Sequence, residues 1–406
     1  MPASSQHHAP RLTASRREGE RVTPLELFFD LVFVLAITQC TALMAHHPTW
    51  PGLLQGLLVL GVLWWGWVGY AWLTSIVDPE EVAVRFFIFV AMASLLIVSL
   101  CVPEAFGDLA LTFALAFGVF RAAHIALFMV ASADEDALRH SALGLAVSTA
   151  IAVSLLVAAS FFDGLAQGAL WALALFVDMA GPYFFGSEGW RFVPGHFAER
   201  HGLIIIIALG ESIVAIGVGA AGHLDFAIGL AAVLGVTLAA ALWWIYFDIV
   251  ALVSAQRLAA AAPGREQNEL ARDSYSYIHY ALVAGIVLSA FGMKTTIGHT
   301  GEHLHTVPAF ALLGGVAAYL LGLVGFRYRH IRTVNRRRLG LAIVLLLLVP
   351  VATAIPSLAS LAIVVVLMVA LVVVEHRGYG EDRSELRQRY SVAHADSPEA
   401  PVPDSG

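Results

Sequence analysis

The chain has 406 residues, of which 59% are hydrophobic and only 13% are charged, and its formal net charge is −7. A soluble domain could not bury that much apolar surface, so the composition excludes soluble and nucleic-acid-binding proteins and indicates a polytopic membrane protein. Cys40 and Cys101 lie inside apolar segments, where a buried small hydrophobe is a better interpretation than a disulfide or a metal ligand.

Twelve apolar stretches are long enough to cross a hydrocarbon core of about 30 Å as helices. In chain order we predict spans at 24–44, 52–77, 82–102, 106–131, 137–160, 163–185, 195–221, 224–253, 274–296, 306–327, 337–355 and 357–374. The predicted fold class is an all-α polytopic membrane protein with about twelve transmembrane helices. The membrane domain is expected over 23–378, and the polar tails at 1–22 and 379–406 are predicted to be disordered.

Arginine placement predicts the orientation. The chain has 23 lysines and arginines, and 21 of them fall in the two tails or around the even-numbered loops. The two exceptions are Arg121, which lies inside a span, and Lys294. The positive-inside rule then places both termini in the cytoplasm.

The two halves, about 23–186 and 194–375, would each contain six spans, which makes any internal repeat parallel. The aromatic segment 63–67 in the second span is similar to segment 242–246 in the eighth, and in both halves the preceding span contains a carboxylate. Two parallel six-helix repeats and a coincidence of common aromatic pairs remain as alternatives.

Two carboxylates lie in the first span. Glu26 and Asp30 are four residues apart and so share one face of the helix. Asp30 lies about 9 Å into that helix, where a carboxylate costs roughly 2.5–3.5 kcal/mol and needs a partner, water or a proton. Glu26 also completes a capping box with Thr23, followed by Pro24, so a purely structural role is its alternative.

Further ionisable residues fall inside later spans. They are Asp178, Glu211 and Asp248, with Arg121, His124 and Arg200 as candidate counter-ions or relays. Lipid does not solvate such groups, so we expect them to pair or to line water, and we predict a shared polar cavity open to the cytoplasm. Arg121 could pair with Asp30 or Asp178, and Arg200 with Glu26 or Asp248.

The structural alternatives differ between these residues. Asp248, near a helix end, could simply reach the interface, and Asp178 could accept N–H groups freed at the nearby Gly181–Pro182 break. His124 fits a hydrogen-bonded packing role as well as a proton relay. Asp30 and Glu211 have no such explanation, so the predicted transport or ion path centres on them. Its further members are Asp178, Asp248 and Glu26.

No catalytic or cofactor motif occurs in the sequence. A loop cluster of His299, Glu302, His303 and His305 matches no rigid zinc motif, and no nucleophile elbow, Walker loop or dinucleotide fingerprint is present. We predict no metal, no cofactor and no enzymatic activity. An intramembrane enzyme acting on lipid, with carboxylates as acid and base, is the catalytic alternative.

Two stretches resemble the bacterial low-temperature-requirement A (LtrA) family. They are ELFFDLVFV at 26–34, and HFAERHG at 196–202 running into ALGESI at 208–213. The resemblance covers roughly 20–375. It implies a multi-pass membrane protein of the bacterial inner membrane that is linked to growth in the cold, and it supplies no substrate.

The segment 28–38 is also similar to the first-helix motif of TMEM-type lysosomal and bacterial potassium channels. In that family the first helix lines the pore. Phe29 stands here where the channel motif has serine.

The buried charges favour a secondary transporter or an ion-conducting protein, with protons, potassium or a small solute as the alternatives for what moves. The competing hypothesis is a non-transporting membrane scaffold or sensor for growth at low temperature. The lipid bilayer is the expected partner, nucleic acid is not, and the sequence specifies no oligomeric state.

Overall fold

The structure is a computed structural model that describes residues 17, 19–133, 135–184, 189–220 and 225–378. Most of the two predicted disordered tails therefore lies outside the described residues. Within those ranges the chain is almost entirely helical, and an isolated β-bridge joins His303 to Pro356.

The first six spans are single helices, apart from a 3-10 turn that extends the third. They are α1 (Pro24–His46), α2 (Trp50–Thr74), α3 (Val82–Cys101), α4 (Ala110–Ala131), α5 (Asp136–Ala159) and α6 (Gly164–Phe184).

The last six spans include two that are interrupted by π-helical turns. They are α7 (Pro194–Gly219), α8 (Phe226–Ile245) continued by η2 (Tyr246–Val250) and α9 (Ala251–Ala260), α10 (Arg265–Ala271) continued by η3 (Arg272–Ile278) and α11 (His279–Gly298), α12 (Thr306–Ile331), α13 (Arg336–Ala352) and α14 (Ser357–Gly378). Eleven of these twelve stretches are long and apolar enough to cross a membrane. The remaining one, α13, has 17 residues, at the lower limit for a span. The predicted all-α membrane fold with about twelve helices is confirmed.

Local capping sets where several helices begin. At α1 the Thr23 hydroxyl accepts the Glu26 N–H (3.4 Å) and the Glu26 carboxylate accepts the Thr23 N–H (2.9 Å). This confirms the predicted capping box, with Pro24 at the first helical position. Thr49 caps α2 and Asp225 caps α8 more simply, each through one side-chain oxygen that accepts a backbone N–H.

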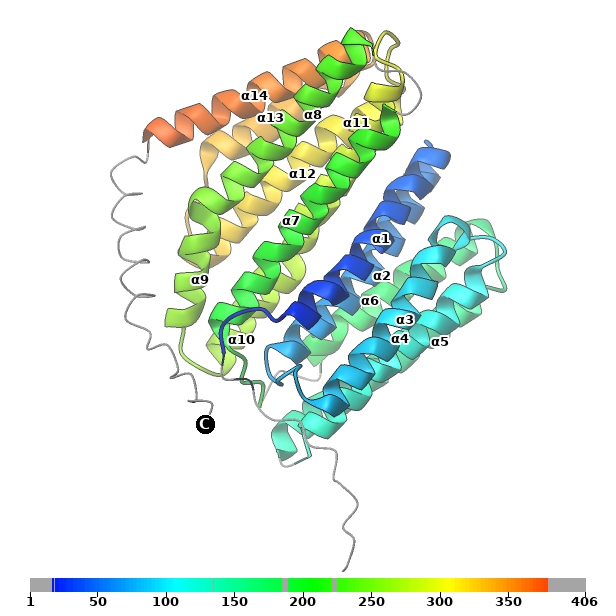
Figure 1. The fold of residues 1–406 in the computed structure, drawn as a ribbon, viewed down its shortest axis with the longest axis vertical. Coiled ribbons are helices and arrows are strands. Elements are labelled where there is room, and N and C mark those ends of the chain that lie inside the picture. The colour runs from blue at the N-terminus through cyan, green and yellow to red at the C-terminus, as the bar shows by residue number, and fades with distance from the viewer. Residues whose placement is uncertain (1–16, 18, 134, 185–188, 221–224, 379–406) are drawn as a thin grey trace, which may run out of the picture.

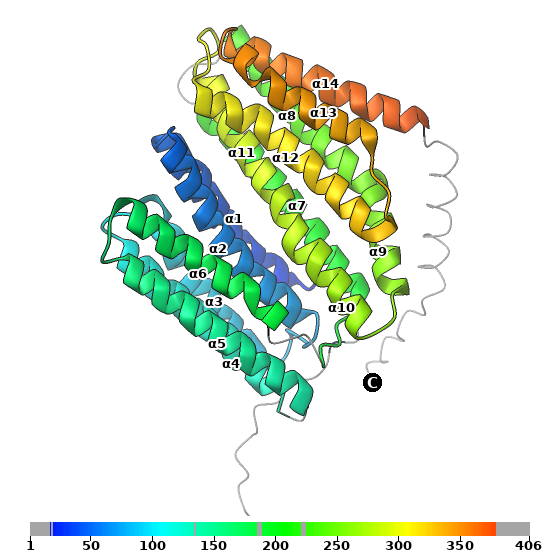
Figure 2. The same ribbon diagram turned by 180° about the vertical axis from the view of Figure 1, so that it is seen from behind.

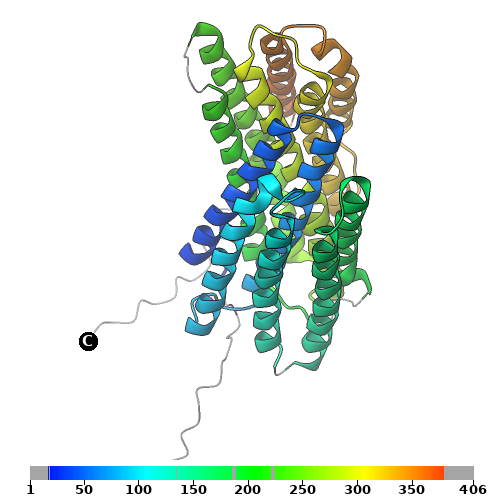
Figure 3. The same cartoon turned by 90° about the vertical axis from the view of Figure 1, so that its right-hand side faces the viewer.

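The helices share one tilt and separate into two groups. Figures 1 and 2 show α1–α6 on one side and α7–α14 on the other, and Figure 3, turned by 90°, shows the same common helix direction. The two groups meet where α1 and α2 pack against α7 and α11. In Figure 1, α1 and α7 begin at the same end of the bundle and so run parallel.

Burial distinguishes central helices from outer ones. In α2, in α10–α11 and in α12, 78% of the residues in the most apolar 18-residue stretch are buried. In the other candidate spans the buried share of such a stretch is 28–50%. Outer helices expose large apolar side chains, such as Phe86 on α3, Leu347 on α13 and Val366 on α14, as expected for surfaces facing hydrocarbon. Both cysteines are free and buried, as predicted.

The two aromatic segments that suggested a repeat differ in environment. Trp64 and Trp65 on α2 are 0% and 4% exposed, whereas Trp243 and Trp244 on α8 are 44% and 42% exposed. The similarity between the segments therefore reflects two different uses of tryptophan. The division into parallel six-helix repeats stays a prediction.

Glycines bring α11 and α12 into backbone contact, which leads to a first prediction. A Cβ on Gly315 would lie 2.7 Å from both Gly285 O and Ser289 N, and backbone atoms there cannot move independently of their helices. Gly315→Ala is therefore expected to lower the free energy of unfolding by about 1–3 kcal/mol through overpacking, measured by thermal unfolding in detergent.

The matched control is Gly210→Ala on α7. A Cβ there meets nothing within 4 Å, so removing a mid-helix glycine should leave stability unchanged or raise it by up to about 1 kcal/mol. Equal stability of the two variants would contradict a close glycine contact between α11 and α12.

Candidate functional site

A buried ion pair joins the two groups of helices. Arg200 on α7 donates from Nη1 to Asp30 Oδ2 (2.7 Å) and from Nη2 to Asp30 Oδ1 (3.1 Å). The Trp67 indole N–H on α2 also donates to Asp30 Oδ1, at 2.9 Å. Asp30 and Arg200 are at most 1% exposed. This two-pronged geometry compensates both charges inside the protein.

Glu26 lies one turn before Asp30 and has its own set of partners. Its Oε2 accepts from Arg17 Nη1 (3.2 Å) as well as from the Thr23 N–H and hydroxyl. His196 Nε2 lies 2.9 Å from Oε1, although neither atom has a well-aligned hydrogen bond, and Arg200 Nε lies 3.9 Å away. Glu26 therefore caps α1 and also belongs to a charge cluster, so its two predicted roles coexist.

The partner of Arg200 differs from the predicted one. The sequence suggested Glu26 or Asp248 for Arg200, but the closest carboxylate is Asp30, and Glu26 is a secondary neighbour. Helix rotation, which periodicity within one span does not define, brings α1 and α7 face to face at these positions. We refer to Arg17, Glu26, Asp30, His196 and Arg200 as the α1–α7 ion cluster.

A second buried pair lies within the first group of helices. Arg121 Nη2 on α4 is 3.1 Å from Asp178 Oδ1 on α6, one of the two pairings predicted for Arg121. Thr149 on α5 connects them, accepting from Arg121 at 2.6 Å and donating to Asp178 at 2.9 Å. His124, one turn along α4, is fully buried between the rings of Tyr70 and Phe128.

Glu211 lies apart from both pairs. It is 1% exposed and accepts a hydrogen bond from the Thr38 hydroxyl on α1. Thr38 is two turns beyond Asp30, about 12 Å along the helix. The α7 helix continues through Gly210 without a break.

Asp248 lies in η2, beside a cavity in the second group of helices. The predicted shared polar cavity stays a prediction, and the structure places the site residues in four separate places. These are the α1–α7 ion cluster, the Arg121–Asp178 pair with His124 beside it, Glu211 with Thr38, and Asp248.

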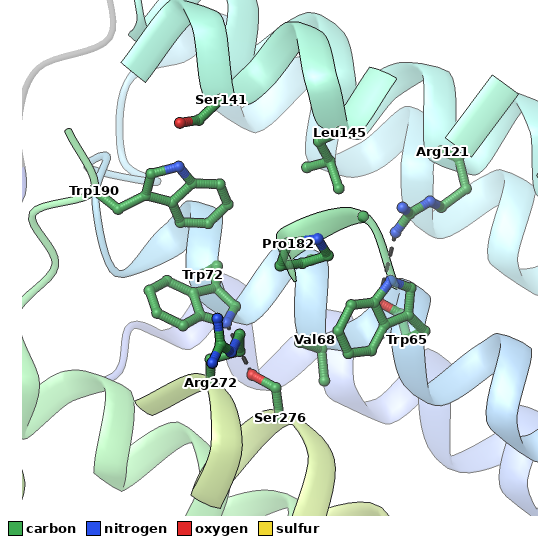
Figure 4. A pocket seen from close by; sticks show the side chains of 12 residues that line it. Trp65, Val68, Trp72, Arg121, Ser141, Leu145, Pro182, Trp190, Arg272 and Ser276 are labelled. Carbon is green, nitrogen blue, oxygen red and sulfur yellow. Dashed lines mark hydrogen bonds between the residues drawn. The ribbon is translucent and has the colours of Figure 1, made fainter. Parts of the chain in front are cut away.

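A narrow aromatic cavity lies between α2, α4, α5, α6 and η3. Figure 4 shows the rings of Trp65, Trp72 and Trp190 around it, with Arg121 near Trp65 and Arg272 near Trp72. Its volume of about 40 Å³ has room for one or two water molecules. Because η3 belongs to the second group of helices, this cavity also touches both groups.

A larger cavity of about 200 Å³ lies among α8, η2, α9, α12, α13 and α14. It is lined by Asp248, by His330 and Arg327 of α12, and by the buried pair of Arg338 with Glu375. Neither of the two cavities is lined by Asp30 or Glu211.

The sequence interpretation missed a histidine–tyrosine cluster in the second group of helices. Tyr246 of η2 contacts His279 through its hydroxyl (2.9 Å), and Tyr275 of η3 stacks on His279 with ring centroids 5.1 Å apart. His201 of α7 lies edge-on to Tyr275. The four-residue spacing of Tyr275 and His279 was a usable signal, but the π-helical turns that aim them inward were not readable from hydropathy.

Within the described residues, several atoms of this cluster have no hydrogen-bond partner. They are the Tyr275 hydroxyl, His201 Nε2 and both ring nitrogens of His330. The His330 ring belongs to the cluster because it lies 5.9 Å from the Tyr275 ring. Buried polar atoms of this kind are usually satisfied by water. The cluster therefore places polar atoms without protein partners beside the α1–α7 ion cluster. His196, four residues before Arg200, was also missed, although that spacing places both on one helix face.

Comparisons with known proteins agree with the fold. The family model described as bacterial low temperature requirement A protein (LtrA) matches residues 21–373. A relative from Rhizobium meliloti (strain 1021), with the printed name Uncharacterized protein RA0937, is 27% identical over 332 residues, covering 78% of this chain and 80% of the relative. No solved structure matches the chain. None of these matches supports the likeness of segment 28–38 to potassium channels.

Proposed function

This chain belongs to the bacterial low-temperature-requirement A (LtrA) family, and on that premise we propose that it is a proton-coupled secondary transporter of the inner membrane. The observation on which the proposal depends is the buried Asp30–Arg200 pair, which joins α1 of one helix group to α7 of the other. Both groups would move against each other during transport, and this pair would open and close.

The choice of residues at this boundary supports a moving contact. A buried ion pair costs desolvation free energy, and well-packed apolar side chains of similar volume often hold two helices as well or better. The Arg121–Asp178 pair shows that a buried pair can also lie within one helix group, so the distinguishing feature of Asp30–Arg200 is its position at the boundary between the groups. A contact that must break, admit water and re-form is better served by groups that are stable both paired and hydrated.

The chemistry of the α1–α7 ion cluster favours protons over potassium. Potassium is coordinated by several oxygens at once, commonly backbone carbonyls. Here Asp30 and Glu26 already face guanidinium groups of Arg17 and Arg200, whose positive charges would repel a bound cation. Carboxylates and histidine can exchange protons without new ligands. Both carboxylates are paired with basic side chains and are not placed as a free acid and base. This pairing favours transport over catalysis.

The proposed orientation has both termini in the cytoplasm. The described start of α1 and end of α14 lie at the same end of the tilted bundle (Figure 1). Arginines gather at that end, in the tails and in the loop between α12 and α13. The α1–α7 ion cluster would then face the cytoplasmic half of the membrane.

The test is proton movement in proteoliposomes that contain a trapped pH-sensitive dye. Purified protein is expected to change the internal pH only when a gradient of a transported solute is imposed, and a panel of organic acids, amines and sugars would be screened. Empty liposomes provide the control, and an imposed potassium gradient distinguishes a channel. Folded protein that moves no proton with any solute would contradict the proposal and favour the scaffold or sensor hypothesis.

A further inference from the structure

The larger cavity in the second group of helices has the features of a binding site. One wall is formed by the π-helical turn η2, which supplies Asp248 and Ile249, and the opposite elements α12, α13 and α14 supply polar side chains. π-Helical turns inside long helices occur frequently at functional sites, because they redirect side chains that a regular helix would aim elsewhere.

Buried hydrogen-bond donors line this cavity. Arg338 is 7% exposed and binds Glu375 through Nη2–Oε2 (2.7 Å) and Nε–Oε1 (3.0 Å), while Asn335 also donates to Glu375 at 2.8 Å. These bonds use two of the three nitrogens of the guanidinium. Nη1 of Arg338 takes part in none of these bonds, so within the part of the chain that the structure describes its N–H groups remain available to a ligand.

His330 adds a second group with unused capacity. It lines the same cavity, and both of its ring nitrogens are buried without a partner among the described residues. A neutral imidazole offers one donor and one acceptor. Arg327, which donates from Nε to the Thr333 hydroxyl, brings a second guanidinium to the lining.

The unused hydrogen-bond donors of the lining favour an anion. The lining contains two guanidiniums and two imidazoles against two carboxylates. Arg338 and Glu375 neutralise each other, and Asp248 has an interaction partner of its own, so the preference for an anion comes from the N–H groups of Arg338 and Arg327 that these contacts leave unused. A ligand would therefore meet mainly donors at the polar end of the cavity.

The rest of the lining is apolar and limits the size of the ligand. Ile245, Val253 and Val372 are among the side chains that form it. The volume of about 200 Å³ exceeds the roughly 150 Å³ of an engineered cavity that binds benzene. The space suits a compact hydrophobic group with one charged end.

We propose that this cavity binds a small organic anion, a carboxylate or phosphate group attached to a short apolar body, held by Arg338, His330 and Arg327. The anion would place its oxygens against these donors and its apolar part along η2. The role of this anion as the transported solute rests on the proposed function. Binding itself does not depend on transport.

Packed rings connect the cavity to the Asp30–Arg200 pair. The His330 ring lies 5.9 Å from that of Tyr275, which lies 5.2 Å from His201, and His201 lies 5.1 Å from Trp67. Trp67 donates to Asp30. Occupancy of the cavity could therefore influence the α1–α7 boundary through contiguous contacts.

The experiment is calorimetric titration of the full-length protein in phosphatidylcholine nanodiscs with three ligands of nearly equal shape. Benzoate is expected to bind saturably, whereas benzamide and benzylammonium, which lack the anionic group, should bind at least about tenfold more weakly. Equal affinity for all three would overturn the assignment. Phosphatidylglycerol added to the nanodiscs distinguishes a lipid source, because competition with benzoate would identify a lipid headgroup as the occupant of the same site.

The variants locate the binding site. His330→Phe and the paired change Arg338→Met/Glu375→Leu, which leaves no charge unpaired, should each weaken benzoate binding about tenfold or more. The same paired change at the surface salt bridge of α10, Arg265→Met/Glu269→Leu, should leave binding unchanged. Benzoate binding that survives both cavity variants would overturn the inference.

The two proposals fail in different ways. Binding that follows this pattern in a protein that moves no protons would remove the transport proposal and keep the anion site. Proton-coupled transport of organic acids that is unaffected by the cavity variants would keep transport and remove the site.

Discussion

Asp30→Asn is expected to lower the free energy of unfolding by about 3–5 kcal/mol, because Arg200 would remain charged and buried without its counter-ion. The amide oxygen of the new side chain would still accept the Trp67 N–H, so the loss reports mainly the missing charge. Thermal unfolding in detergent, supported by steric trapping in bicelles, measures the change. The same variant is expected to abolish solute-driven proton movement.

The double variant Asp30→Asn/Arg200→Met separates stability from transport. Removing both charges should restore most of the lost stability, because replacing a buried pair by uncharged groups is often neutral or better. Transport should stay absent, since the reversible contact between α1 and α7 is gone. Additive losses in the double variant would contradict the pairing, and normal transport by it would contradict the proposed role of the pair.

Arg121→Met is expected to have a similarly large effect on stability, about 3–5 kcal/mol, because it leaves Asp178 buried and unpaired. The double variant Arg121→Met/Asp178→Leu should recover most of this loss, and Thr149 can then donate to a carbonyl of its own helix. Stability is measured as for Asp30.

Transport by this second double variant is expected to be retained, in contrast to the first. Arg121 and Asp178 both belong to α1–α6, so their contact does not cross the boundary between the helix groups. Retention would identify the pair as a structural element of one group. Loss of transport in a stably folded double variant would return Asp178 to the transport path and would make the aromatic cavity of Figure 4 part of it.

The proposals for the remaining site residues follow from where the structure places them. Glu211 stays a candidate for the transport path, because it is buried at the same α1–α7 boundary as Asp30 and contacts Thr38. Asp248 becomes part of the wall of the anion cavity. His124 is enclosed by aromatic rings within the first helix group, but neither of its ring nitrogens has a hydrogen-bond partner among the described residues, so its hydrogen-bonded packing role and its relay role both stay predictions.

Local sequence was sufficient for the helices. A span is recognised from about twenty consecutive residues, because the thickness of the hydrocarbon core sets the required length. The capping box at Thr23 and Glu26 was predictable for the same reason, since all its atoms lie within one turn. The LtrA motifs likewise identified the family from contiguous stretches.

Tertiary structure decided which charges meet. The sequence suggested Arg121 for Asp30, and Glu26 or Asp248 for Arg200. The rotation of each helix about its axis, set by packing along its whole length, instead brought Asp30 to Arg200. The π-helical turns η2 and η3 shift the register of the residues after them, and so they determined that Tyr246, Tyr275 and His279 would cluster. Hydropathy defines which segments enter the membrane, because the free energy of transfer into lipid depends on each residue's own side chain. Charge pairing depends instead on contacts between residues as far apart as 170 positions.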